Sequence, residues 1–117
     1  PCDVVLSATN VVQPDIVFIS KDRLGIIEEE CIRGAPDLVI EIVSPSTMKL
    51  DCLRKRDIYE RHGIVHYWIV DPDEKTIDAY ELAGGGYRLI AELGARDCFE
   101  PKLFPGLRIE LAKVFGA

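Results

Sequence analysis

The chain is 117 residues long, 48% of its residues are hydrophobic, and its formal net charge is −6. This length suits one domain with a single core, and the hydrophobic share excludes a disordered chain. The acidic balance argues against a protein whose whole surface binds nucleic acid, but it does not exclude a nuclease, because metal-binding carboxylates themselves add negative charge.

Two β-branched segments open the chain. Residues 4–7 and 11–20 are predicted to form strands that are joined as a hairpin through residues 8–10. Pro14 cannot donate to a strand ladder, so the second strand is expected at a sheet edge or a bulge. The polar residues 21–33 are predicted to form a loop with at most one short helical turn.

A continuous apolar run at residues 37–43 is interrupted only by Glu41. This pattern is typical of a strand that is covered on both faces. An unpaired carboxylate is costly in such a place, so Glu41 needs a metal, a partner charge or a chemical task. A simple salt bridge to a nearby Lys or Arg is the structural alternative. Residues 44–47 end the strand and offer hydroxyl caps for the next element.

One helix is predicted over residues 48–62, and Gly63 ends it. At about 100° per residue, one sector of this helix faces the core. That sector holds Met48, Asp51, Cys52, Lys55, Ile58, Tyr59 and His62. A lysine on an inward face often snorkels to solvent, but a Lys55 aimed at Glu41 would explain both unusual positions together.

The second half of the chain reads mainly as strands. Residues 65–70 are predicted to form one strand, and residues 76–82 and 87–93 form a hairpin through the glycines at 84–86. An amphipathic segment at 107–115 ends the chain. The predicted fold is therefore α/β, a mixed sheet with few helices.

A second carboxylate, that of Asp15, is expected near Glu41 if the strands predicted at residues 11–20 and 37–43 are neighbours. Side-chain alternation then places Asp15 and Glu41 on one face of the sheet, with Lys55 packed above them. Two carboxylates with backbone carbonyls suit a hard cation such as Mg²⁺ or Mn²⁺. Such a site can generate hydroxide from bound water and neutralise charge on a phosphate.

Four sequence blocks support a family resemblance. They are Gln13-Pro14-Asp15, residues 34–47, Asp51-x-x-x-Lys55-x-x-x-Tyr59 and residues 63–72. In this order they resemble the Uma family of restriction endonucleases, a branch of the PD-(D/E)XK nuclease superfamily. The resemblance implies a restriction-endonuclease-like core, a mixed β-sheet with one main helix after the catalytic strand, and metal-dependent phosphodiester cleavage.

The resemblance also assigns residues. It implies Asp15, Glu41 and Lys55 as catalytic residues, and Asp15, Glu41 and the carbonyl of Ile42 as metal ligands. Val43 stands where the superfamily lysine is expected, and Lys55 matches the helix lysine that replaces it in this branch. Relatives carry an upstream helix and strands, so residues 1–117 are expected to be one nuclease domain that lacks these N-terminal elements.

The predicted function is a Mg²⁺- or Mn²⁺-dependent endonuclease acting on double-stranded DNA, with a homodimer as a possible assembly. The alternative is a non-catalytic nucleic-acid-binding or protein-interaction module on a degenerate nuclease fold. A weaker alternative is a metal-free hydrolase that uses Asp15 and Glu41 as an acid/base pair. The basic residues that are candidates for DNA contact are Lys49, Arg54, Lys55, Arg56 and Arg61.

Other chemically capable residues favour structural roles. The four cysteines lie far apart without a C-x-x-C pair, which predicts free thiols in a reducing cytosol. No apolar run can span a bilayer and no secretion signal opens the chain, so a cytoplasmic protein without a membrane partner is predicted. His62 and His66 lack further ligands at metal spacing. Trp68 is predicted to lie in the core rather than to stack on bases.

Overall fold

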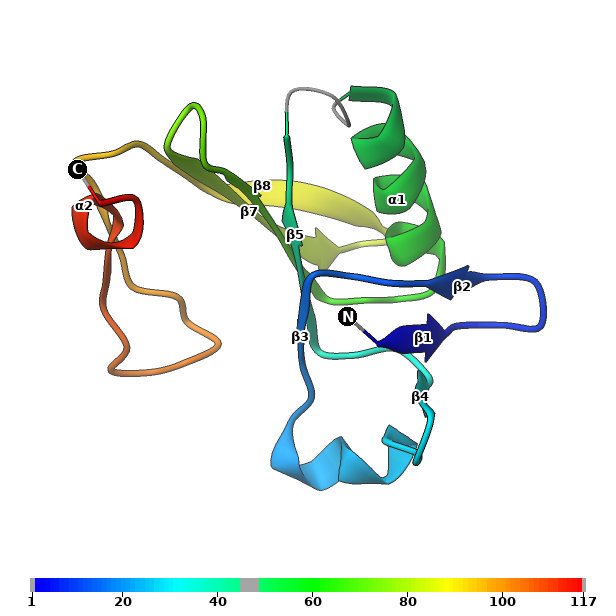
Figure 1. The fold of residues 1–117 in the computed structure, drawn as a ribbon. Coiled ribbons are helices and arrows are strands. Elements are labelled where there is room, and N and C mark those ends of the chain that lie inside the picture. Colours follow the sequence, from blue (N-terminus) through cyan, green and yellow to red (C-terminus); the bar gives the residue numbers. More distant parts are fainter. Residues whose placement is uncertain (1, 45–48, 117) are drawn as a thin grey trace.

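A computed structural model describes residues 2–44 and 49–116 of the chain (Figure 1). Its centre is a five-stranded mixed sheet in the order β3-β5-β6-β7-β8. The strands are β3 (Ile16–Phe18), β5 (Leu38–Ile42), β6 (His66–Asp71), β7 (Thr76–Ala83) and β8 (Gly86–Leu93). Only β5 and β6 pair in parallel, and the other neighbours are antiparallel. The predicted strands at 37–43 and 65–70 and the predicted hairpin are confirmed.

Helix α1 (Lys49–Arg61) lies in the connection between the two parallel strands. Parallel neighbours need such a crossover, whereas antiparallel neighbours can be joined by a short hairpin. The helix ends as predicted at Gly63, whose φ is 74°. There the N–H of Ile64 donates to the carbonyl of Tyr59, and the N–H of Gly63 donates to the carbonyl of Glu60. This paired arrangement needs a left-handed residue, which glycine supplies at little cost.

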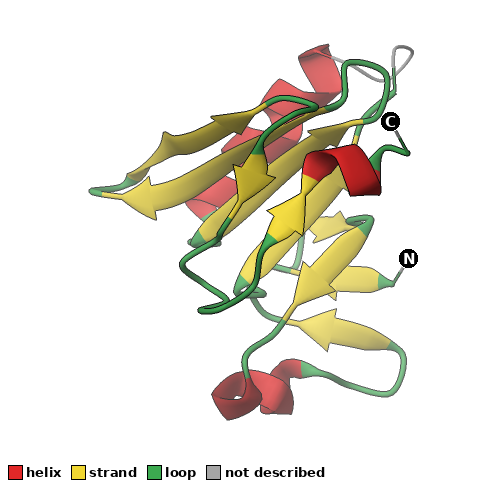
Figure 2. Ribbon diagram, turned by 90° about the vertical axis from the view of Figure 1, so that its left-hand side faces the viewer, coloured by secondary structure: helices red, strands yellow, loops and turns green. Residues whose placement is uncertain are grey.

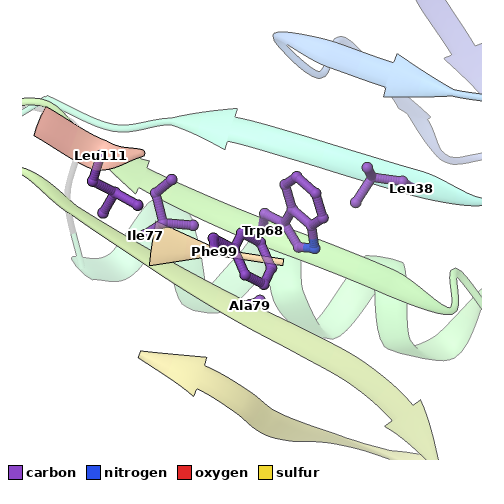
Figure 3. Close-up of a cluster of buried hydrophobic side chains, with 6 residues drawn as sticks. All are labelled: Leu38, Trp68, Ile77, Ala79, Phe99 and Leu111. Atoms are coloured by element: carbon purple, nitrogen blue, oxygen red, sulfur yellow. The ribbon is translucent and has the colours of Figure 1, made fainter. Parts of the chain in front are cut away.

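The two faces of the central sheet are covered by different parts of the chain (Figures 1 and 2). Helix α1 lies on one face, and its buried core consists of Val39, Tyr59, Ile64, Tyr67 and Tyr87. The C-terminal segment covers the other face with β9 (Cys98–Phe99), β10 (Ile109–Glu110) and α2 (Leu111–Val114). The buried core there consists of Leu38, Trp68, Ile77, Ala79, Phe99 and Leu111 (Figure 3). Trp68 is therefore a core residue, as predicted.

A second, three-stranded sheet lies beside the first, and it differs from the predictions for residues 11–20 and 21–33. Its order is β2-β1-β4, from β1 (Asp3–Val5), β2 (Val11–Val12) and β4 (Cys31–Arg33). The hairpin of β1 and β2 is confirmed. The predicted single strand at 11–20 is wrong, because the chain leaves this sheet around Pro14 and enters the central sheet as β3. Proline has no backbone N–H to donate to a neighbouring strand, so Pro14 fits the point where the chain leaves one sheet better than it fits the middle of a strand.

The segment between β3 and β5 contains a 3-10 helix, η1 (Lys21–Ile26), which is longer, at about two turns, than the single short turn predicted at most. The prediction of an otherwise irregular loop is wrong, because β4 pairs in parallel with β1. Such a pairing depends on a strand far away in the sequence and leaves no local pattern. None of the described helices is long and apolar enough to cross a membrane.

Candidate active site

Glu41 lies near the end of β5 and is 3% exposed. Helix α1 supplies partners to both of its carboxylate oxygens. The ammonium of Lys55 lies 3.3 Å from Oε1, and the hydroxyl of Tyr59 donates a hydrogen bond to Oε2. The predicted contact between Lys55 and Glu41 is confirmed. This contact is a salt bridge, so the structural explanation for the buried carboxylate is also met.

Lys55 has a second carboxylate partner on its own helix. Its Nζ lies 3.4 Å from Oδ2 of Asp51, one helical turn earlier. Partial burial alone would lower the pKa of Lys55, but the attraction and hydrogen bonds of Glu41 and Asp51 outweigh it and raise the pKa. The ammonium therefore stays charged at neutral pH and is shared between two carboxylates.

The pKa of Glu41 is raised, and burial is the main cause. The hydrogen bond from Tyr59 and the charge of Lys55 act in the opposite direction, while the negative charge of Asp15 adds to the increase. Two donors thus do not fully compensate for the loss of water around this carboxylate. A further positive charge at Glu41 would favour its ionised form.

Asp15 comes directly after the buried Pro14 and directly before β3. Its Oδ2 accepts a hydrogen bond of 2.7 Å from the backbone N–H of Ile42. This bond fixes the Asp15 carboxylate beside the end of β5, because β3 and β5 are antiparallel neighbours. The predicted pairing of the strand beside Asp15 with the strand that holds Glu41 is confirmed, although Asp15 itself precedes β3.

These groups line one cleft of about 190 Å³. The lining consists of Asp15, Glu41, Ile42, Val43, Asp51, Cys52 and Lys55. Three carboxylates face a single ammonium there, so the described lining has a formal charge of −2. A cleft with this charge attracts a cation and repels a bare phosphate.

The donor set of the cleft suits a magnesium-like cation. Mg²⁺ usually binds proteins through one or two carboxylates and keeps several waters. Asp15 and Glu41 supply the two carboxylates, and Ile42 borders the same cleft. In the described part of the chain, no group of three or more His, Cys, Asp or Glu side chains is arranged to hold a metal. The carboxylate oxygens of Asp15 and Glu41 are the ligand type that a hard, partly hydrated cation prefers.

Tyr59 is the residue at this site whose role the sequence did not reveal. A tyrosine on the inward face of a helix reads as packing, and its ring is indeed fully buried. The available signal was its position four residues after Lys55, which places both side chains on one side of the helix.

Other candidate residues lie elsewhere or have different partners. His62 contacts the carbonyl of Ile58 through Nδ1, and His66 lies 3.9 Å from Glu81. All four cysteines are free, as predicted. Met48 and the predicted caps at 45–47 lie outside the described residues, as does the side chain of Lys49.

The predicted basic cluster is largely engaged by its neighbours. The guanidinium of Arg56 lies 4.9 Å from the centre of the Tyr80 ring, and Arg61 pairs with Asp57 at 3.1 Å. Within the described part of the cluster, Arg54 is an exposed side chain for which no such contact is seen.

Comparisons with known proteins identify the family of the chain and a solved structure with a similar fold. Residues 1–112 match the model of the Uma2 family, which is described as "Putative restriction endonuclease". A crystal structure from Anabaena variabilis superposes with a TM-score of 0.75 at 22% sequence identity. That protein is described as a "putative nuclease belonging to DUF820", and the match covers 97% of this chain and 64% of that one. No curated protein matches the chain.

Proposed function

The chain belongs to the Uma2 family, and we propose that it is a divalent-metal-dependent endonuclease acting on double-stranded DNA. Family and fold together indicate a restriction-endonuclease-like nuclease. The observation that carries the finer proposal is the buried Glu41, which shares a negatively charged cleft with Asp15 and Lys55. A purely structural carboxylate would not need a second acid beside it.

In this proposal, Asp15, Glu41 and the backbone carbonyl of Ile42 hold Mg²⁺ or Mn²⁺. When bound, such an ion lowers the pKa of a coordinated water and neutralises charge on a phosphate oxygen. The hydrogen bond from Ile42 N–H orients the Asp15 carboxylate for this role. Burial raises the pKa of Glu41, so a cation bound beside it would favour its ionised form.

Lys55 is proposed to orient the attacking water or to stabilise the negative charge that develops on the phosphate. Its ammonium already lies at the cleft, and Asp51 keeps it there. The water oxygen forms a bond to phosphorus while the bond to the leaving oxygen breaks. The leaving oxygen takes up a proton, so the products are a phosphomonoester and a free hydroxyl. A homodimer would bring one such site to each strand of a duplex.

The test is cleavage of supercoiled plasmid by the chain in the presence of Mg²⁺ or Mn²⁺. We expect nicking that a chelator abolishes and that Glu41→Gln slows by a factor on the order of 10³. Glu81→Gln is the matched control, because this acid pairs with His66 outside the cleft. We expect this control variant to cut like the wild type.

Two outcomes would contradict the proposal in different ways. Cutting that persists in chelator would remove the metal and favour an acid/base pair of Asp15 and Glu41. Plasmid binding without cutting, equal in the wild type and in Glu41→Gln, would favour a non-catalytic binding module.

A further inference from the structure

We infer that Tyr59 is a positioning residue that reserves one oxygen of Glu41 for the cation. Its hydroxyl holds Oε2, so the carboxylate presents Oε1 to the cleft. The inference rests on the proposed function, because it assigns how the same site takes its metal. The geometry of Glu41 carries it: the two carboxylate oxygens have different partners from different turns of α1.

The Tyr59 hydroxyl is held rigidly. The residue is 0% exposed, and its ring meets the Tyr67 ring edge-on, with centroids 5.3 Å apart and an interplanar angle of 70°. Close packing against the sheet leaves such a side chain little room to shift, so its hydroxyl stays beside Oε2 of Glu41. The hydroxyl therefore acts as a fixed donor that prevents the Glu41 carboxylate from turning about its terminal bond.

The other oxygen lies among groups that can change partners. Lys55 approaches Oε1 of Glu41 at 3.3 Å, but it also lies 3.4 Å from Oδ2 of Asp51. If a cation takes Oε1, the ammonium retains Asp51 as an acceptor and stays at the cleft. The fully buried Tyr59 hydroxyl has no acceptor other than Glu41 among the described contacts, so it keeps Oε2. The geometry thus points to coordination through one oxygen of Glu41.

Tyr87 offers a matched control in the same core. Its hydroxyl is buried and donates a hydrogen bond of 2.6 Å to the carbonyl of Ile64. Changing Tyr87 to phenylalanine removes the same atom and one buried hydrogen bond, but the acceptor of that bond is the backbone carbonyl of Ile64 and not a carboxylate of the cleft. A general loss of packing or stability would affect both variants, whereas a loss of positioning would affect only Tyr59→Phe.

The experiment measures Mn²⁺ affinity from the electron paramagnetic resonance signal of the free ion. We expect Tyr59→Phe to weaken Mn²⁺ binding about 10-fold or more, as outer partners of metal ligands do, while Tyr87→Phe stays within about 2-fold of the wild type. Equal affinity of Tyr59→Phe and the wild type would overturn this inference and leave the proposed nuclease intact. A wild type that binds no Mn²⁺ would overturn the proposed metal site itself.

A second measurement needs no variant that might unfold. In wild-type chain with ¹³C-labelled tyrosine rings, Mg²⁺ should shift the Cζ resonance of Tyr59 and leave that of Tyr87 in place. The physical reason is that the Tyr59 hydroxyl donates to a carboxylate whose charge the ion redistributes. An unmoved Tyr59 resonance at saturating Mg²⁺ would overturn the inference.

Discussion

The two ends of β5 carry carboxylates with opposite behaviour. Asp37, directly before the strand, accepts a 2.7 Å hydrogen bond from the N–H of Ser20 and pairs with Arg23 at 3.3 Å. Partial burial acts to raise the pKa of Asp37, but these partners outweigh it and lower the pKa. Glu41 near the other end also has two donors, yet burial keeps its pKa raised.

The difference between the two acids is depth rather than the number of partners. The side chain of Asp37 is 23% exposed, and that of Glu41 is 4% exposed. Water still solvates Asp37, so two donors are enough to favour its charge. Glu41 has lost its water, so the same number of donors leaves its charge undercompensated. Asp37 therefore ties the start of β5 to Ser20 and Arg23, while Glu41 is the acid that the proposed function assigns to the metal.

The largest effect in this comparison is expected from Lys55→Met. It removes the ammonium that pairs with the buried Glu41 among the described residues, and breaking a buried pair costs about 3–5 kcal/mol when both partners are fully buried. Lys55 is 30% exposed, so we expect a smaller loss of about 2–3 kcal/mol in the free energy of unfolding. Urea denaturation in chelator measures this change.

Adding Glu41→Gln to Lys55→Met provides the control, because the double variant contains no unpaired buried charge. We expect it to recover most of the lost stability, so the two changes should be strongly non-additive. If the losses in unfolding free energy of the two single variants simply add in the double variant, the charge of Glu41 does not depend on Lys55 as this comparison requires.

A smaller effect, with a definite dependence on pH, is expected from Asp37→Asn. Because the pKa of Asp37 lies below its ordinary value of 3.8 in the fold, its ionised form contributes stability at neutral pH. We expect the variant to lose about 1–2 kcal/mol at pH 7. The difference from the wild type should shrink as the pH falls below about 4 and through the folded-state pKa. Denaturation curves across this range test the sign, and a difference that grows on acidification would contradict it.

The smallest effect is expected from Arg23→Gln. Arg23 is 40% exposed, and such surface pairs contribute about 0.2–1 kcal/mol. Asp37 keeps its hydrogen bond from Ser20, so the loss in unfolding free energy should be about 0.5 kcal/mol or less. Added salt should reduce it further. A loss as large as that of Asp37→Asn would mean that the ion pair, rather than the backbone hydrogen bond, holds the start of β5.

Much of the site was predictable because it follows local periodicity. An apolar run marks β5 and singles out Glu41, and helical spacing places Lys55 and Asp51 on the side that meets it. The hydroxyl of Tyr59 was not predictable in the same way, because an inward tyrosine satisfies the pattern by packing alone. Which oxygen that hydroxyl reaches depends on the distance between helix and sheet.

The mistakes concern contacts between distant segments. Pro14 correctly marked a disruption, but the sequence did not show that the chain changes sheets there. Strand β4 was missed because its parallel partner β1 lies far upstream. Asp15 was nevertheless assigned to the correct neighbourhood, because the antiparallel pairing of β3 with β5 sets its position even though Asp15 itself precedes the strand.

The contacts of Glu41 also have a consequence for how the chain folds. Lys55 and Tyr59 are separated from Glu41 by 14 and 18 residues, whereas Asp15 and Ile42 are 27 apart. Closing a shorter loop costs less entropy, and local contacts generally form earlier. We therefore expect the docking of α1 on β5 to bring both donors to the carboxylate before the strand after Asp15 completes the edge. In this order of assembly the buried charge gains its donors first, and the cleft that Asp15 lines is completed afterwards.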